Sequence, residues 1–203
     1  GNVDTTFAFR SANELQIAAF AVQPDGRILC GGRSANPGDG RYLVRLNSDG
    51  TLDESFSASV ATLENTTAGF QPEATALLLQ PDGRILVGGR FDRVGEIGMR
   101  NLARLNSDGS ADATWQEGAG FEGSILHLAQ QGDGRILVVG GFNVFQGQQH
   151  NRLARLEADG AIDTTFESDI LNVSALLLQG DGHIVVGGGF SEVNGQPRGG
   201  LVR

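Results

Sequence analysis

A four-fold internal repeat constrains the fold of this chain more than any other feature. One shared segment has the form Leu-Leu-Leu-Gln-Pro-Asp-Gly-Arg-Ile-Leu-Val-Gly-Gly, with small variations, and it occupies residues 20–32, 77–89, 128–140 and 176–188. After a variable stretch, a second shared segment close to Leu-Ala-Arg-Leu-Asn-Ser-Asp-Gly follows at residues 43–56, 102–115 and 153–166. The chain therefore consists of four similar structural units, with first-turn glycines 57, 51 and 48 residues apart: Gly26, Gly83, Gly134 and Gly182.

The fourth copy is split between the two ends of the sequence. It stops at Arg203, and its missing part resembles the other terminus, because Gly1-Asn-Val-Asp-Thr-Thr-Phe7 matches Gly160-Ala-Ile-Asp-Thr-Thr-Phe166. Counterparts of residues 156–159 are lacking between the two parts. We expect one domain over 1–203, with repeat units at 17–56, 74–115, 125–166 and 173–203 plus 1–7. A monomer closed without a covalent link, a larger ring of two chains and a piece of a longer array all remain open.

Each copy is expected to form four antiparallel strands. The first strand is almost wholly apolar, as in Leu77–Gln80, which is typical of a strand buried on both faces. An Asp-Gly turn leads to a second strand ending in Gly-Gly, where missing Cβ atoms permit a bulge or a close backbone approach. The third strand alternates apolar and charged residues, and a fourth ends in Asp-x-Thr-Phe in most copies. No helical apolar stripe is present, so we predict an all-β fold.

Four-stranded antiparallel units repeated at about 50 residues are typical of the blades of a β-propeller. We therefore predict a β-propeller with four blades in this chain. The last blade would be completed by the N-terminal strand, which would latch the ring and remove its exposed edges.

The repeated motifs resemble the bacterial delta-60 repeat over essentially the whole chain. The resemblance rests on Gln-Pro-Asp-Gly-Arg-Ile-Leu-Val-Gly-Gly, Leu-Ala-Arg-Leu-Asn-Ser-Asp-Gly and Asp-x-Thr-Phe. It implies a β-propeller module of a large secreted or cell-surface bacterial protein, without defined catalytic residues. The N-terminus shows no signal-peptide pattern and begins at Gly1, so we expect a processed product or an excised piece.

Composition excludes several functional classes. The net charge is −9, without a basic block, which disfavours nucleic-acid binding. No apolar run approaches the roughly 20 residues that cross a bilayer, so we expect no membrane insertion. Cys30 replaces a valine of the other copies, and three histidines (His127, His150 and His183) share no repeat position. We expect no enzyme, no cofactor and no metal, because the short Asp-Gly turns also lack the spacing of a calcium loop.

Charged and aromatic residues recur once in each copy, which favours an architectural role. An arginine of the third strand should face an aspartate of the fourth across a hairpin and fix its register. The predicted pairs are Arg45 with Asp53, Arg104 with Asp112, Arg155 with Asp163, and Arg203 with Asp4. The aromatic residues are expected to fill the wedge between blades: Phe7, Phe56, Trp115 and Phe166 after the fourth strand, and Phe91, Phe142 and Phe190 after Gly-Gly.

The remaining connections vary between copies, and variable loops on a rigid scaffold are where recognition residues accumulate. We expect a protein or carbohydrate ligand to bind this variable face, where a group of arginines could hold a carboxylate or sulfate. The candidate contacts are Arg41, Tyr42, Arg93, Arg100, Trp115, Phe121, His150, Arg152 and Arg198, with Glu122 and Phe145 beside them. Two alternatives stay open: a structural spacer without a ligand, and a hydrolase or lyase centred on the channel.

Overall fold

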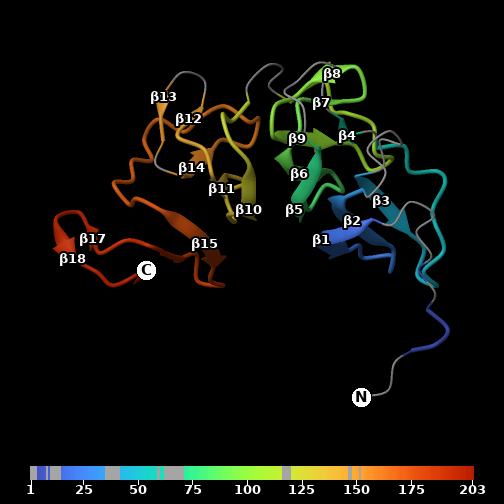
Figure 1. Cartoon of the computed structure of the whole chain (residues 1–203), viewed down its shortest axis with the longest axis horizontal. Coiled ribbons are helices and arrows are strands. Elements are labelled where there is room, and N and C mark those ends of the chain that lie inside the picture. The colour runs from blue at the N-terminus through green and yellow to red at the C-terminus, as the bar shows by residue number, and fades with distance from the viewer. Residues whose placement is uncertain are drawn as a thin grey trace.

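The computed structural model describes residues 4–7, 9, 15–34, 42–58, 60–61, 71–115, 120–145, 148–150 and 152–203. These residues contain β-strands and no helix, which confirms the predicted all-β class. Four three-stranded antiparallel sheets form the blades, and they are arranged along an arc (Figure 1).

Each blade has the same strand order from the inside of the arc outwards. Blade 1 contains β1 (Gln16–Val22), β2 (Ile28–Arg33) and β3 (Leu43–Leu46); blade 2 contains β5 (Glu73–Leu79), β6 (Ile85–Arg90) and β9 (Leu102–Leu105). Blade 3 contains β10 (Ile125–Gln130), β11 (Ile136–Gly140) and β14 (Leu153–Leu156); blade 4 contains β15 (Val173–Leu178), β16 (Ile184–Gly188) and β19 (Leu201–Val202).

The predicted fourth strand is reduced to a single bridge in the described blades. These bridges join Leu46 to Leu52, Leu105 to Ala111 and Leu156 to Ile162. The chain turns immediately afterwards, because an aspartate carboxylate accepts hydrogen bonds from the backbone N–H and the hydroxyl of the residue two positions on. In blade 3, Asp163 Oδ1 lies 2.9 Å from Thr165 N and 2.6 Å from its hydroxyl. This local turn competes with a longer ladder.

The Gly-Gly pairs of blades 1, 2 and 4 face a bulge in the first strand, as predicted, and in blade 3 Val139 and Gly140 take the same place. The register of β5 against β6 shifts between Ala74 and Ala76. A Cβ atom on Gly89 would lie 2.0 Å from the carbonyl oxygen of Glu73. A Cβ atom on the corresponding glycine of another blade would lie 2.0 to 2.2 Å from a backbone oxygen; these glycines are Gly32, Gly140 and Gly188. Only glycine allows this approach between the first two strands.

The connections after the second strands form small outer hairpins, which lie at the periphery of the arc in Figure 1. They consist of β7 (Arg93–Val94) with β8 (Ile97–Gly98), β12 (Val144–Phe145) with β13 (Gln148–Gln149), and β17 (Glu192–Val193) with β18 (Gln196–Pro197). The crossing from blade 1 to blade 2 joins the first hairpin, because β4 (Val60–Ala61) pairs with β7. Phe121 likewise forms a bridge with Phe145 in the next crossing.

The core consists of apolar clusters between successive blades. The predicted wedge residues lie in them: Phe91 and Phe142 are fully buried, and Trp115 is 3% exposed. Phe56 and Phe166 pack against the clusters between blades 1 and 2 and between blades 3 and 4. The predicted packing role of these aromatic residues is confirmed.

The N-terminal segment does not complete the last blade. Residues 4–7 form no strand, and Phe7 packs against the cluster of Leu15, Cys30 and Leu46 on blade 1. In Figure 1 the segment descends from the blade 1 side, whereas the C-terminus lies beside β15 of blade 4. The contact of Phe7 with these three residues keeps the N-terminal segment on blade 1, the first blade of the arc. The predicted latch within one chain is absent from the described residues.

Candidate functional site: the loop face and the paired arginines

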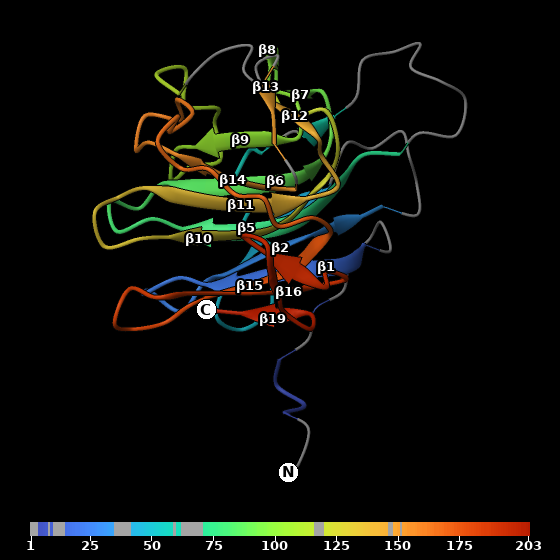
Figure 2. The same ribbon diagram turned by 90° about the vertical axis from the view of Figure 1, so that its left-hand side faces the viewer.

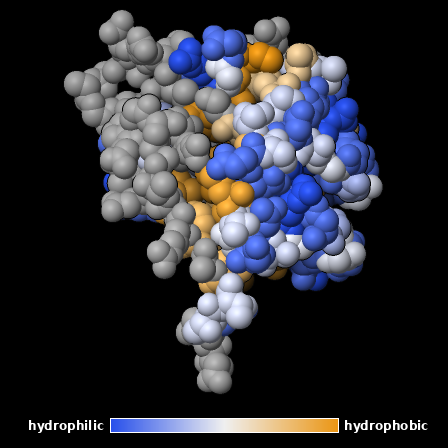
Figure 3. Space-filling view, turned by 90° about the vertical axis from the view of Figure 1, so that its right-hand side faces the viewer, coloured by the Kyte–Doolittle hydropathy of each residue, from blue (hydrophilic) through white to orange (hydrophobic). Residues whose placement is uncertain are grey.

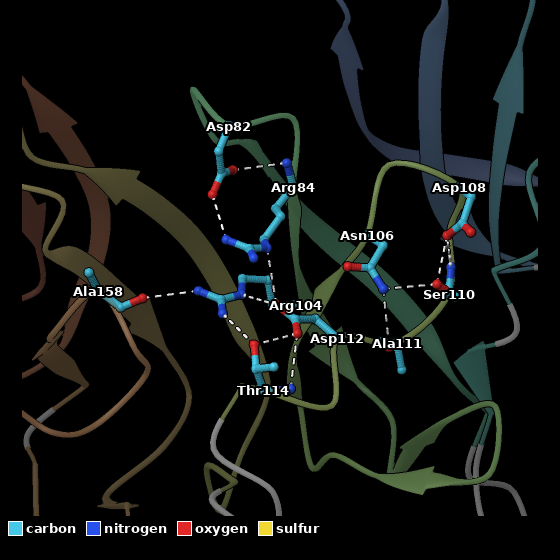
Figure 4. Close-up of polar contacts among 10 residues, drawn as sticks. All are labelled: Asp82, Arg84, Arg104, Asn106, Asp108, Ser110, Ala111, Asp112, Thr114 and Ala158. Atoms are coloured by element: carbon cyan, nitrogen blue, oxygen red, sulfur yellow. Dashed lines mark hydrogen bonds and ion pairs between the residues drawn. The ribbon is translucent and has the colours of Figure 1, made fainter.

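Arg104 and Asp112 form a buried ion pair that connects two blades (Figure 4). Arg104 Nε donates to Asp112 Oδ2 at 2.7 Å, and its Nη1 donates to the carbonyl oxygen of Ala158 in blade 3 at 3.0 Å. The guanidinium group lies over the Trp115 ring, 4.5 Å from its centroid. One arginine thus holds its own hairpin and the turn of the next blade.

Blades 1 and 3 repeat the same pair. Arg45 and Arg155 lie 2.7 Å from Asp53 and Asp163, and their guanidinium groups lie over Phe56 and Phe166. Arg45 also reaches the next blade, where it donates to the carbonyl oxygen of Ser107. These three pairs confirm the predicted register contacts.

The fourth predicted pair, Arg203 with Asp4, is not formed. Both residues are exposed, and the Asp4 carboxylate accepts hydrogen bonds from Thr6 within its own turn. The reason is the position of the N-terminal segment against blade 1.

Hydrogen bonds lower the pKa values of these aspartates. The hydroxyl of Ser55 is the largest cause for Asp53, and Arg45 adds to it against the opposing effect of burial, so the pKa is about 2. Thr165 and Arg155 act in the same way on Asp163, whose pKa is also about 2. Carboxylates that stay ionised and bonded have no proton to offer near neutral pH, so they cannot serve as general acids there.

The loop face consists of the outer hairpins, the residues that lead from them to the third strands, and the inter-blade crossings. In Figure 2 the hairpins of blades 2 and 3 gather at the top of the molecule, away from the Asp-Gly turns at the left. Among the predicted contacts on this face, Arg100, Arg152 and Arg198 are exposed. Arg93 is half-buried, and Arg41 lies outside the described residues.

Three predicted aromatic contacts are corrected by the structure. Tyr42 is 1% exposed, Trp115 is 3% exposed and Phe121 is fully buried. Tyr42 packs between blades 1 and 2, and the other two pack between blades 2 and 3. Phe145, noted beside them, is also buried, and its ring stacks on that of Phe121 at a centroid distance of 4.2 Å. These rings stabilise the interior and cannot stack on a ligand.

His150 is half-buried behind this aromatic group. Its ring lies 6.5 Å from that of Phe145 in an edge-on arrangement, and burial lowers its pKa. Its Nε2 atom has no hydrogen-bond partner among the described residues. A neutral imidazole in this position is a weak candidate for binding an anion.

Sequence reasoning missed the buried floor of the loop face. Each hairpin directs one apolar side chain inwards, three residues after the wedge phenylalanine: Val94, Phe145 and Val193. The repeated spacing from Phe91, Phe142 and Phe190 was the available signal. The apparently variable loops therefore share an internal structure, and only their outward residues differ freely.

The inner side of the arc holds a shallow groove between β1, β5 and β10. Its lining includes Phe20, Thr75, Leu126 and His127, and no carboxylate or thiol contributes to it. Thr75 donates its hydroxyl to the Ile125 carbonyl. Among the described residues, no group of three His, Cys, Asp or Glu side chains could hold a metal ion. The residues that the structure describes also contain no helix that is long and apolar enough to span a membrane.

Repeated three-stranded blades that pack face to face, with arginine bridges from blade 1 to blade 2 and from blade 2 to blade 3, define a β-propeller repeat protein. The chain belongs to the family described as domain of unknown function (DUF5122) beta-propeller, which matches residues 23–56, 80–114, 131–166 and 179–203. The matched segments fall on the four blades, which confirms the predicted fold class. A search of curated proteins gives no match.

Proposed function

We propose that this domain is a non-catalytic binding module that recognises an anionic group on a protein or glycan through its loop face. The observation that carries the proposal is the contrast between two sets of arginines. Arg45, Arg104 and Arg155 are engaged in ion pairs, whereas Arg100, Arg152 and Arg198 are exposed shortly before the third strands of three successive blades. Exposed guanidinium groups bind carboxylate and sulfate through paired N–H donors.

The backbone of Arg152 supports this assignment. Its φ is 66°, in a region that L-residues with long side chains rarely adopt. The equivalent positions of the neighbouring blades hold Asn101 and Gly200, which tolerate this conformation. A strained backbone at an exposed residue is typical of functional positions.

The absence of catalysis and the location are part of the same proposal. The groove lining on the inner side offers one imidazole, His127, and one hydroxyl, that of Thr75, which donates to the Ile125 carbonyl; no carboxylate lies in this lining. The resemblance to the delta-60 repeat supports a place outside the cytoplasm, on the cell surface or in a secreted protein.

The test is a binding screen with a matched control. The probe is an array of sulfated and carboxylated oligosaccharides, and the variant carries Arg100→Gln, Arg152→Gln and Arg198→Gln. The control carries Arg27→Gln, Arg84→Gln and Arg135→Gln on the Asp-Gly turn face, whose side chains are 37–43% exposed. We expect a salt-sensitive signal that only the loop-face variant loses. An equal loss in both variants would contradict the proposal.

A structural spacer without a ligand is the second candidate. Burial of Tyr42, Trp115 and Phe121 favours it, because it removes the aromatic groups that would stack on a sugar. A wild-type array without any binding signal would favour this spacer over a binding module.

A further inference from the structure

We propose that the edge of the hairpin strand β17 in blade 4 binds an extended peptide of a partner protein as an added strand. The peptide would place an apolar side chain opposite Val193 and a basic side chain opposite Glu192. This site uses none of the three exposed arginines of the loop face, so it goes beyond the binding function proposed above. It emerges from a comparison of the outer hairpins of blades 2, 3 and 4.

In blades 2 and 3, a residue of the preceding crossing covers the edge of the outer hairpin. Val60 pairs with Val94 of β7. Phe121 forms a bridge with Phe145 of β12. The two crossing residues are fully buried, and their hairpin partners are each 1% exposed. A segment of the chain itself thus closes both of these edges.

The crossing before blade 4 has a polar residue at the place of Phe121. Ser124 and Asn172 take the same place before the first strands of blades 3 and 4, where the carbonyl oxygen of each accepts a backbone hydrogen bond from the end of the second strand. Three residues before them stand Phe121 and Asp169 respectively. The apolar residue that covers the hairpin of blade 3 is therefore replaced by an exposed aspartate in blade 4.

Asp169 contacts the hairpin through its side chain and leaves the backbone edge of β17 open. Its Oδ2 atom accepts from the backbone N–H of Asn194 at 2.6 Å. In blade 3, the Glu122 N–H donates to the carbonyl oxygen of Val144 at 3.0 Å. Glu192 is the counterpart of Val144, and its carbonyl oxygen has no donor among the described residues. An added strand would supply this donor.

A pocket of about 260 Å³ lies beside this edge, and its lining includes Ile170, Val193 and Asn194. Val193 is half-buried, whereas its counterparts in blades 2 and 3 are 1% exposed. The pocket has room for one large apolar side chain, since a cavity of about 150 Å³ already holds benzene. Such a side chain would cover Val193 as Val60 covers Val94.

The open edge does not depend on residues beyond Arg203. In blades 2 and 3 the covering residues come from the crossing before each blade, and residues 167–172 before blade 4 are all described. A continuation of β19 would pair with Ile184, as Leu105 pairs with Ile85 next to the Asp-Gly turn. Ile184 and Arg203 line the pocket at that end. The hairpin lies at the opposite end of the blade, so its edge stays uncovered.

Three exposed carboxylates favour a basic segment as the occupant. Glu167 and Asp169 line the pocket, and Glu192 lies on β17. Among the described residues, none of the three forms an ion pair. In an antiparallel added strand, the residue after the one opposite Val193 faces Glu192, as in the pairing of β4 with β7. Facing opposite charges stabilise a strand pair, so the segment carries an apolar residue followed by arginine or lysine.

The first experiment titrates the 203-residue chain with a synthetic heptapeptide in which a central leucine precedes an arginine and all other residues are threonine. We expect binding that protects the Glu192 amide from hydrogen exchange. Replacement of the leucine by serine should weaken binding about ten-fold, because the pocket then stays empty. N-methylation of the arginine should weaken binding about ten-fold as well, because it removes the donor to the Glu192 carbonyl.

The second experiment exchanges the charges of the facing pair. Glu192→Arg should weaken binding of the arginine peptide, and a peptide with glutamate at that place should bind this variant better than the wild type. The control is Glu96→Arg, the same change at an exposed residue of the blade 2 hairpin, whose edge β4 covers.

Asp169→Phe copies the crossing of blade 3 into blade 4. The new side chain should fill the pocket and abolish peptide binding. A thermal unfolding temperature at or above that of the wild type shows that this variant folds.

Exposed apolar surface elsewhere provides a control for nonspecific binding. Figure 3 shows apolar atoms on the side of the molecule where blade 1 lies, and Phe20 of β1 is 71% exposed. Phe20→Ser should bind the peptide as the wild type does.

Four outcomes would overturn the proposal. Failure of the leucine–arginine peptide to bind the wild type excludes the site, and equal affinity of the N-methylated peptide excludes strand addition. Equal losses in Glu192→Arg and Glu96→Arg would indicate general charge attraction. Protection of the Glu192 amide that rises with protein concentration in the absence of peptide would identify a second copy of this chain as the occupant.

Discussion

Arg104 Nε donates to Asp112 Oδ2 over 2.7 Å, and both side chains are less than a tenth exposed. Arg84, which is 41% exposed, approaches the same oxygen at 3.2 Å. One carboxylate thus has a buried and an exposed arginine partner, and burial should decide the energetic contribution of each.

Arg104→Met should lower the free energy of unfolding by about 3 kcal/mol, because it leaves a buried carboxylate without its buried arginine partner. Arg84→Gln should cost less than about 1 kcal/mol, since exposed pairs contribute little. Urea unfolding of both variants, with Asp112→Asn to complete a double-mutant cycle for Arg104, measures the difference. Equal losses would show that burial does not determine the strength of this pair.

Acid should destabilise the protein between about pH 4 and pH 2. Asp53 and Asp163 have a pKa of about 2 in the folded state against 3.8 for the unperturbed carboxyl. A lowered pKa means that their contribution is complete above the unfolded pKa and is lost as the pH falls through the folded pKa. Chemical unfolding at a series of pH values should show this loss.

Ser55→Ala removes the hydroxyl that contributes most to the lowered pKa of Asp53. The difference in unfolding free energy between wild type and variant should be constant near neutral pH and shrink below about pH 3, where Asp53 becomes protonated. A difference that does not change with pH would assign the low pKa to another cause.

The repeated Gly-Gly pairs should be intolerant of a methyl group at the second glycine. Gly89→Ala should cost at least about 2 kcal/mol, because the new Cβ would lie 2.0 Å from the carbonyl oxygen of Glu73. Gly98→Ala is the control, since nothing lies within 4 Å of its Cβ position, and its effect should stay within about 1 kcal/mol. Thermal unfolding followed by circular dichroism compares the two, and comparable losses would argue against the close approach.

Cys30 should behave as a small apolar residue. It is 3% exposed, burial raises the pKa of its thiol, and valine takes its place in the other blades. Cys30→Val should change the free energy of unfolding by less than about 1.5 kcal/mol. The native protein should also react slowly with a thiol reagent, and rapid labelling would contradict this placement.

The sequence was sufficient to predict contacts between residues that lie close together along the chain. The Arg104–Asp112 pair spans one hairpin, so alternation and turn position predict it. The bulge opposite Gly89 could be predicted from the glycine that recurs at this position in every copy. The buried positions of Tyr42 and Phe121 could not be predicted in this way, because their neighbours come from other blades and from the hairpins.

The N-terminal heptapeptide is a second case in which the sequence predicts local structure but not the tertiary contact. Its match to residues 160–166 predicts the Asp4 turn, which the structure contains. A match of local sequence does not specify which blade the segment contacts, because every blade offers the same type of wedge. Phe7 lies on blade 1, so the contact of the segment depends on packing beyond its own residues.

The four blades form an arc, and the position of a blade in this arc should determine how readily the blade opens locally. Each blade is held by its neighbours, so the middle sheets are clamped on both sides and the outer ones on one side only. Amide protons of β15 should therefore exchange with solvent faster than those of β5 and β10, as a gradient of local opening along the polypeptide.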